Sequence, residues 1–374
     1  MKTKLISGIK MICYTRISLL AGLCIALFSA QGYYTNGIKQ GKETWGYVSV
    51  RDGAHMFFWL YYTTADVDYK TRPLLIWLQG GPGASSTGIG NFLEIGPQDT
   101  LLNNRTNAWN EHVNVLFIDN PVGTGFSYVD DPKNLANNNT VIANDLVEFM
   151  KGFLLKVPEF ENVPLFIFAE SYGGKMAVRF AQTLNKAVIS KKIKCQVAGV
   201  AMGDSWISPV DAVASWGPYL YHTSLVDSIG LSQISAKASQ VEAAVKSGAM
   251  KNATKLWSET ESVIEKVTNG VNFYNILTHD GLSSTTSNQI NRIKRFSKPY
   301  LGSLYQRHVG ILQAELDKLM NGPVRDKLKS TININLASQK QILSERMMHD
   351  FLNPTFMIAL KELDTLYLNN PNAK

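Results

Sequence analysis

Ser171 lies where a strand is expected to turn sharply into a helix. The residues before it, 164–169, are mostly apolar, and two glycines, Gly173 and Gly174, follow it. The segment 175–188 then has the apolar periodicity of a helix. A turn this tight needs small residues on its far side, and it holds the serine hydroxyl clear of the sheet. The pattern is typical of a nucleophile elbow; the alternative is an ordinary strand–helix turn that contains a serine.

Two earlier segments repeat the layout of a short apolar strand followed by a glycine-rich loop. The apolar run 73–79 leads into the loop 80–83, and the run 113–119 leads into the loop 123–125. With the strand before Ser171 they predict a mostly parallel sheet flanked by helices. In such sheets the chemistry lies at the carboxyl ends of the strands, so we expect the three loops to converge on one rim.

These three segments resemble the signature sequences of the serine carboxypeptidases, which are exopeptidases with the α/β-hydrolase fold. The matching stretches are 77–86, 119–128 and 169–174. Three further stretches resemble an animal branch of the same family: 203–211, 216–220 and 269–277. The resemblance runs from about residue 41 to 329, and more weakly beyond. It implies an α/β-hydrolase-like, mostly parallel sheet with a helical cap insertion.

The resemblance also implies a role for each matching residue. Ser171 would be the nucleophile that attacks the last peptide carbonyl. The backbone N–H groups of Gly81 and Tyr172 would form the oxyanion hole, which typically contributes about 3–4 kcal/mol per donor to the transition state. In the family the terminal carboxylate of the substrate is held by a Trp, an amide and two acidic residues. The matching positions are Trp77, Gln79, Glu94 and Glu170, and many family members carry Asn in place of Gln79.

Each of these carboxylate-binding candidates also has a plainer interpretation. Trp77 could be a core residue, Glu94 could cap a turn, and Glu170 could be a solvated loop charge. Their joint occurrence around Ser171 favours the functional interpretation. A carboxylic acid that donates a hydrogen bond to a carboxylate needs a raised pKa, which fits the acidic pH optimum of the family.

An α/β-hydrolase also needs a general-base His oriented by an Asp, in the chain order Ser, Asp, His. The histidines after Ser171 are His222, His279, His308 and His349. None lies in a segment like the one that carries the family's base, and they are more simply interpreted as loop or helix-surface residues. The segment 357–368 resembles the helix just before the triad Asp. We therefore expect the sequence to end before the triad Asp and His, and before the strands that carry them.

A serine without its base is a weak nucleophile at neutral pH. Two function classes therefore remain open. The first is a serine carboxypeptidase that acts through an acyl-enzyme at Ser171. The second is a catalytically inactive protein that binds peptide C-termini on the same scaffold. An acyltransferase that uses the same site, as in some plant members of the family, is a third alternative.

The first 32 residues predict a signal peptide. Four basic residues precede an apolar run at 17–28: Lys2, Lys4, Lys10 and Arg16. The alternative is an uncleaved signal anchor. Without these four charges the formal net charge falls from +7 to +3 (7 − 4 = 3), which is not typical of nucleic-acid binding. Three glycosylation sequons begin at Asn104, Asn138 and Asn252. These features predict a secreted or lysosomal glycoprotein.

Two of the three cysteines, Cys13 and Cys24, lie in this leader, so we expect Cys195 to be a buried, unpaired thiol. The rest of the sequence predicts an α/β core at 33–204, a helical cap at 205–330, and a C-terminal helix with an incomplete core at 331–374. No metal-spaced cluster or phosphate loop is found, so no cofactor is predicted. The expected partners are peptide or protein C-termini, with no nucleic acid and no stable membrane association after signal cleavage.

Overall fold

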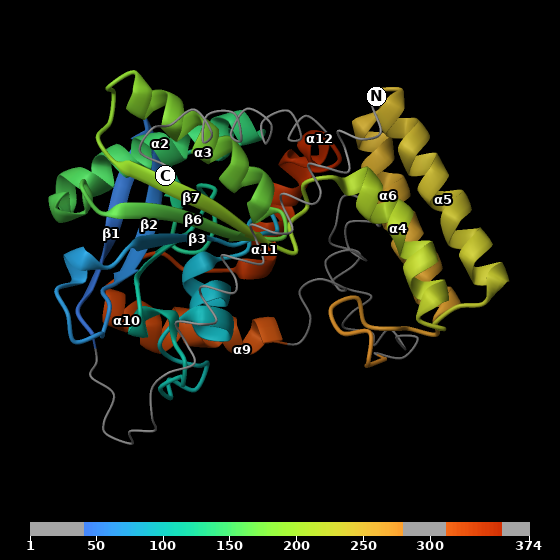
Figure 1. Cartoon of the computed structure of the whole chain (residues 1–374), viewed down its shortest axis with the longest axis horizontal. Helices are drawn as coiled ribbons and strands as arrows, with labels where there is room; N and C mark the ends of the chain where they lie inside the picture. The colour runs from blue at the N-terminus through green and yellow to red at the C-terminus, as the bar shows by residue number, and fades with distance from the viewer. Residues whose placement is uncertain (1–40, 280–311, 354–374) are drawn as a thin grey trace. The chain divides into compact units, whose positions relative to one another are not determined.

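The computed structural model describes residues 41–279 and 312–353 (Figure 1). Within these residues a seven-stranded sheet runs in the order β1-β2-β4-β3-β6-β7, and β5 pairs with β2. The strands are β1 (Glu43–Arg51), β2 (Ala54–Tyr61), β3 (Leu74–Leu78), β4 (Asn114–Ile118), β5 (Tyr128–Val129), β6 (Pro164–Glu170) and β7 (Gln196–Gly203). Strands β4, β3, β6 and β7 are parallel, whereas β1, β2 and β5 add antiparallel pairs. The predicted mostly parallel sheet is confirmed.

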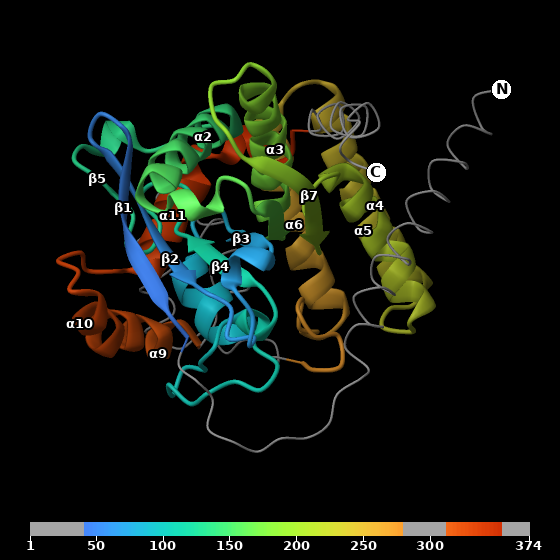
Figure 2. The same ribbon diagram turned by 60° about the vertical axis from the view of Figure 1, so that its left-hand side comes forward.

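Side chains alternate between the two faces of the sheet, and each face packs against different helices. On one face Phe58 and Ile76 join the core with α2 (Asn139–Lys156) and α3 (Gly173–Ile189). On the other face Phe57 and Phe117 pack against α9 (Leu312–Leu319) and α10 (Arg325–Leu328). Figure 2 shows these two helix pairs on opposite sides of the sheet. Burial on both faces explains why β3 is apolar throughout and why β4 is apolar after its first residue, Asn114.

A group of three helices follows β7: α4 (Pro209–His222), α5 (Ser228–Lys246) and α6 (Met250–Val267). They share an apolar cluster that includes Val213, Val241 and Trp257. Leu352, which follows α12 (Met348–Phe351), is fully buried in the same cluster. The short helix α12 therefore packs against this group of three helices. The boundaries predicted for the cap, 205–330, remain a prediction. Helices α9 and α10 fall within these boundaries but pack on the sheet.

Cys195 is buried and unpaired, as the sequence predicts. Among residues 41–279 and 312–353, no helix combines the length and the apolar character needed to cross a membrane.

A buried carboxylate joins the glycine-rich loops that follow β3 and β4. Asp119, which directly follows β4, is fully buried and accepts four hydrogen bonds. Ser85 Oγ donates at 2.7 Å, Thr87 donates through its N–H at 3.1 Å and its hydroxyl at 2.7 Å, and Phe126 N–H donates at 2.9 Å. Burial raises the pKa of Asp119, while these donors act in the opposite direction by stabilising its charge. The carboxylate thus fixes both loops relative to each other.

Replacing this carboxylate should destabilise the whole fold. Asp119→Ala leaves four buried donors without their acceptor, so we expect the free energy of unfolding to fall by about 3 kcal/mol or more. Asp119→Asn, which keeps one acceptor oxygen, should lose less. Urea unfolding measures both effects. Asp66→Ala, at an exposed aspartate, is the control and should be neutral; an equal loss in this control would contradict the role given to Asp119.

Candidate active site

Ser171 has a backbone conformation that side chains rarely adopt. Its φ is +55°, in the left-handed region, at the turn between β6 and α3. The turn is held by backbone hydrogen bonds: Ser171 N–H donates to Gly203 O at 3.1 Å, and Ser171 O accepts from Gly174 N–H at 3.1 Å and Trp206 N–H at 2.9 Å. Such local strain persists only where surrounding structure imposes it, and it is concentrated at functional sites.

The turn also needs glycine beside it. A Cβ atom on Gly80 would lie 2.8 Å from Ser171 Cβ and 3.0 Å from Tyr172 N, closer than side-chain atoms normally approach. A Cβ on Gly173 would collide with the carbonyl oxygen of Leu78. The glycine loop after β3 is therefore pressed against the serine turn. Two of the three loops expected to converge, those after β3 and β6, therefore meet at Ser171.

The two predicted oxyanion donors belong to these adjoining segments. Tyr172 N–H lies at the start of α3, next to Ser171, and Gly81 N–H lies one residue beyond the close approach of Gly80. Neither N–H donates a hydrogen bond to any residue in the described ranges. Unpaired N–H groups at a helix start favour negative charge. Their role as oxyanion donors remains a prediction.

The four predicted carboxylate-binding side chains lie together. Trp77 Nε1 donates to Gln79 Oε1 at 2.7 Å. Gln79 Nε2 donates to Glu94 Oε1 at 3.1 Å, and also to Glu170 Oε2. Trp77 comes from β3, Glu94 from the π-helical segment Ser86–Ile95, and Glu170 from the last position of β6. One amide thus bridges two carboxyl groups directly beside Ser171.

Two carboxyl groups this close do not both ionise readily. Burial first, and then the charge of Glu170, raise the pKa of Glu94 to about 7; the Gln79 hydrogen bond and Arg105 act against the shift. Burial and the charge of Asp204 raise the pKa of Glu170. Glu94 Oε2 is buried without a hydrogen-bond partner among the described residues. A protonated Glu94 can therefore donate a hydrogen bond to an incoming carboxylate.

Helix α11 (Leu336–Arg346) lies over both glycine loops. Gln339 exchanges two hydrogen bonds of 3.0 Å with the backbone of Gly125, and a Cβ on Gly83 would lie 2.9 Å from Lys340 Cα. The Lys340 ammonium is close enough to Glu170 to lower the pKa of that carboxyl group. Burial lowers the pKa of Lys340 itself to about 8, opposed by Glu170 and Glu261. Sequence reasoning missed Lys340, because it is a lysine in a helical pattern outside the signature stretches.

None of the described histidines is hydrogen-bonded to the serine hydroxyl. His222 and His279 are exposed, and His349 Nδ1 pairs at 3.6 Å with Asp350. Ser171 Oγ makes no hydrogen bond to any residue in the described ranges, and His308 lies outside them. Within those ranges, no group of three His, Cys, Asp or Glu side chains is arranged to hold a metal ion.

Comparisons with known proteins identify the family. The serine carboxypeptidase family model matches residues 35–362. This chain therefore belongs to the serine carboxypeptidases, a family of peptidases, as its signature stretches predicted. It is 47% identical to the retinoid-inducible serine carboxypeptidase of Rattus norvegicus, over 93% of this chain and 77% of that protein. It is 48% identical to the Homo sapiens protein of the same name, over 86% of this chain and 71% of the relative.

Solved structures support the fold. The prohormone-processing carboxypeptidase Kex1 of Saccharomyces cerevisiae superposes with a TM-score of 0.68 at 19% identity, over 88% of this chain and 72% of the Kex1 chain. A plant relative, serine carboxypeptidase-like 51 of Arabidopsis thaliana, is 41% identical over 84% of this chain and 71% of its own length. The α/β-hydrolase fold predicted from the sequence is confirmed.

The raised pKa of Glu94 should make its contribution to stability depend on pH. The unfolded chain loses this proton near the ordinary pKa of 4.5, whereas the folded chain keeps it to about 7. The unfolded state is therefore favoured as pH rises through this window, and stability present below it is lost. Glu94→Gln carries no such proton, so its stability relative to the natural chain should increase between pH 4.5 and 7.5.

Urea unfolding of both proteins across this pH range measures the effect. Glu111→Gln, outside the carboxyl pair, is the matched control and should follow the natural chain. A stability difference between Glu94→Gln and the natural chain that stays constant with pH would show that Glu94 titrates normally.

Proposed function

We propose that this protein removes C-terminal residues from peptides through an acyl-enzyme at Ser171. The observation that carries the proposal is the group of Trp77, Gln79, Glu94 and Glu170 beside a strained serine. An endopeptidase has no need of a proton-donating carboxyl pair next to its nucleophile. A carboxypeptidase needs one, because the free α-carboxylate of its substrate lies one residue from the scissile bond.

The reaction would begin with binding of the substrate carboxylate. The Glu94 carboxyl group would donate its proton to that carboxylate, in place of its present contact with Glu170. The Gln79 amide, now shared by Glu94 and Glu170, would supply a second donor. This places the last peptide carbonyl at Ser171. Binding energy from a group that does not react thus orients the carbonyl that does.

Ser171 Oγ would then attack the carbonyl carbon, and the N–H groups of Tyr172 and Gly81 would stabilise the oxyanion. The C–N bond breaks, the released amino acid takes up a proton, and water hydrolyses the ester at Ser171. In this family the proton of the serine passes to a His that is oriented by an Asp. The group formed by Trp77, Gln79, Glu94 and Glu170 and the unpaired N–H groups of Gly81 and Tyr172 support this proposal.

One observation favours a second candidate function, peptide binding without turnover. Ser171 Oγ has no hydrogen-bond partner among residues 41–279 and 312–353, and a serine without a base is a poor nucleophile. In that case the same pocket would hold peptide C-termini and release them unchanged.

Both candidates require recognition of a free carboxylate. An N-blocked dipeptide acid should therefore bind at least about tenfold more tightly than its amide, a difference of ~1.4 kcal/mol. Its affinity should fall as pH rises through about 7, because Glu94 then loses the proton that it donates. Calorimetry at pH 5 and 8 measures both effects. Equal affinity for acid and amide would exclude a carboxylate pocket.

Turnover separates the two candidates. A carboxypeptidase releases the terminal amino acid of the dipeptide acid at pH about 5, and a serine-directed phosphonate labels Ser171 with one-to-one stoichiometry. Ser171→Ala is the control, since it should retain binding and lose labelling. Binding without amino-acid release or labelling would assign the protein to the peptide-binding class.

We also propose that the chain enters the secretory pathway and is secreted or lysosomal, without nucleic-acid partners or stable membrane association. Two sequon asparagines, Asn104 and Asn252, are exposed, and Asn138 caps α2 by accepting from Val141 N–H at 2.9 Å. The signal-like segment 1–32 lies outside the described residues.

Expression in animal cells tests this location. An endoglycosidase should lower the apparent mass of the protein, and replacing all three sequon asparagines with Gln should abolish the shift. A chain that remains unglycosylated in the cytosol would contradict the proposed route.

A further inference from the structure

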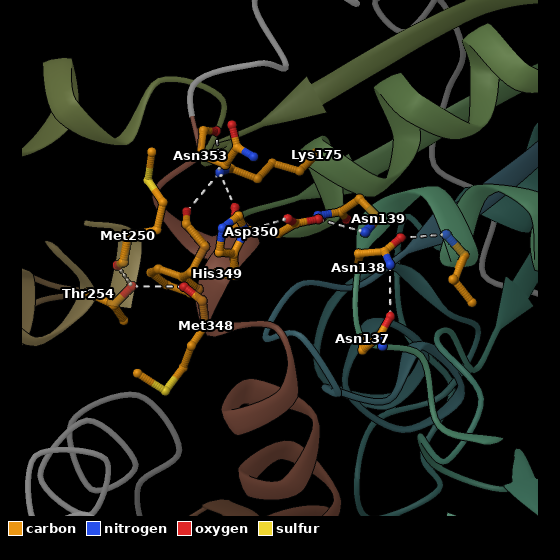
Figure 3. A network of polar contacts seen from close by, with 12 residues as sticks. Asn137, Asn138, Asn139, Lys175, Met250, Thr254, Met348, His349, Asp350 and Asn353 are labelled. Atoms are coloured by element: carbon orange, nitrogen blue, oxygen red, sulfur yellow. Dashed lines mark hydrogen bonds and ion pairs between the residues drawn. The ribbon is translucent and has the colours of Figure 1, made fainter. Parts of the chain in front are cut away.

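Lys175 is a buried lysine that the proposed reaction does not use. It lies in the first turn of α3, four residues after Ser171, and is fully shielded from solvent. Its Nζ donates to three backbone carbonyls: Asp350 at 3.0 Å, Phe351 at 2.7 Å and Asn353 at 3.2 Å (Figure 3). An ammonium group has three N–H donors, so all of them find acceptors here. The acceptors lie at the end of α12 and just beyond it.

The side chain of Asp350 binds a second segment that is distant in sequence. Its Oδ2 accepts from Asn139 N–H at 2.8 Å and from Asn139 Nδ2 at 3.1 Å. Asn139 is buried at the start of α2. Figure 3 shows Asp350 between the Lys175 side and the Asn139 side of this network. Burial lowers the pKa of Lys175 to about 7, and the nearby Asp350 carboxylate opposes that shift.

A third helix also holds α12 in place. Thr254 of α6 donates from its hydroxyl to Met348 O at 3.0 Å, a contact that Figure 3 also shows. The indole N–H of Trp206 donates to Phe351 O at 3.1 Å. Trp206 itself donates its backbone N–H to Ser171 O. The path of α12 is thus linked by hydrogen bonds to the turn that carries the serine.

These contacts meet at Tyr172, whose N–H is a proposed oxyanion donor. The Tyr172 hydroxyl accepts from Asn139 Nδ2 at 2.8 Å. Its ring stacks on Phe351, with centroids 5.5 Å apart and planes 21° apart, and Lys175 Nζ lies 5.8 Å from the ring centre. Tyr172 is almost completely buried. Both its ring face and its hydroxyl are therefore fixed by residues of this network.

We propose that Lys175, Asp350 and Asn139 form a clasp that positions Tyr172, and with it the N–H that faces the developing oxyanion. The three are positioning residues, because they act through Tyr172 and α12 and do not touch the peptide. The inference rests on the proposed function at Ser171. Displacement of a reacting group by about 1 Å can lower the rate by roughly 100-fold, so loss of this positioning should slow the reaction strongly.

The test separates chemistry at Ser171 from peptide binding and from folding. In Lys175→Met, the second-order rate constant for phosphonate labelling of Ser171 should fall at least tenfold. The dissociation constant of an N-blocked dipeptide acid should change less than twofold, because the carboxylate pocket is formed by other residues. Lys192→Met, at an exposed lysine after α3, is the matched control and should label at the natural rate.

A gentler variant covers the case in which Lys175→Met does not fold. Tyr172→Phe removes only the hydroxyl contact to Asn139 and keeps the ring stack. We expect a three- to tenfold slower labelling rate in a folded protein whose midpoint of urea unfolding falls only modestly. Asp350→Asn should lower the rate as well, and its effect should not add to that of Tyr172→Phe, since both act through Asn139.

Two outcomes would overturn the clasp in different ways. Folded Tyr172→Phe and Asp350→Asn proteins that label at the natural rate would remove the inference and leave the proposed function intact. A natural chain whose Ser171 is never labelled would remove both the inference and the nucleophile. If that chain still bound the peptide acid more tightly than its amide, the proposed carboxylate site would stand independently of the nucleophile.

Discussion

The left-handed backbone of Ser171 is the constraint on which the rest of the site depends. A side chain at φ +55° is unfavourable in isolation, and here it is imposed by hydrogen bonds to Gly203, Gly174 and Trp206. The same turn brings Gly80 so close that only glycine fits. The position of the serine, the start of α3 and the path of the loop after β3 are therefore one geometric solution. A change in any of them would move the proposed oxyanion donors relative to the hydroxyl.

The two carboxyl groups beside Ser171 impose a second constraint, because they are held close together in a buried place. The end of β6 places Glu170 beside the serine turn, and the segment Ser86–Ile95 places Glu94 where Gln79 bonds to both. Burial and the repulsion between the two adjacent carboxylates together raise the pKa of Glu94, so that it retains a proton. The arrangement costs stability at neutral pH but creates a proton donor for a carboxylate. Such a cost is understandable at a binding site, where function competes with stability.

Much of this could be predicted from the sequence because the informative signals are local. The apolar strands β3, β4 and β6, the glycines after them and the amphipathic helix after Ser171 are each encoded within about ten to twenty residues. The roles of Lys175 and Lys340 could not be predicted in this way. Each lies in a helical pattern where a lysine normally faces solvent. Lys175 is instead fully buried, and Lys340 is half-buried where its main chain packs against Gly83. A pattern along one segment carries no information about which distant backbone will cover it.

Several contacts between the late segment 336–353 and the site involve backbone atoms of that segment. Lys175 donates hydrogen bonds to three backbone carbonyls of this segment, and Trp206 donates to one of the same three, Phe351 O. Gly83 leaves room for the main chain at Lys340. Backbone contacts depend on the path of the chain more than on its side chains, so the sequence can drift while the path is kept. We therefore expect most side-chain substitutions in this segment to be tolerated as long as the path of the chain is kept. The exceptions are Asp350, Phe351 and Gln339, which make their contacts through side chains. Substitutions at these three positions should be the least tolerated in the segment.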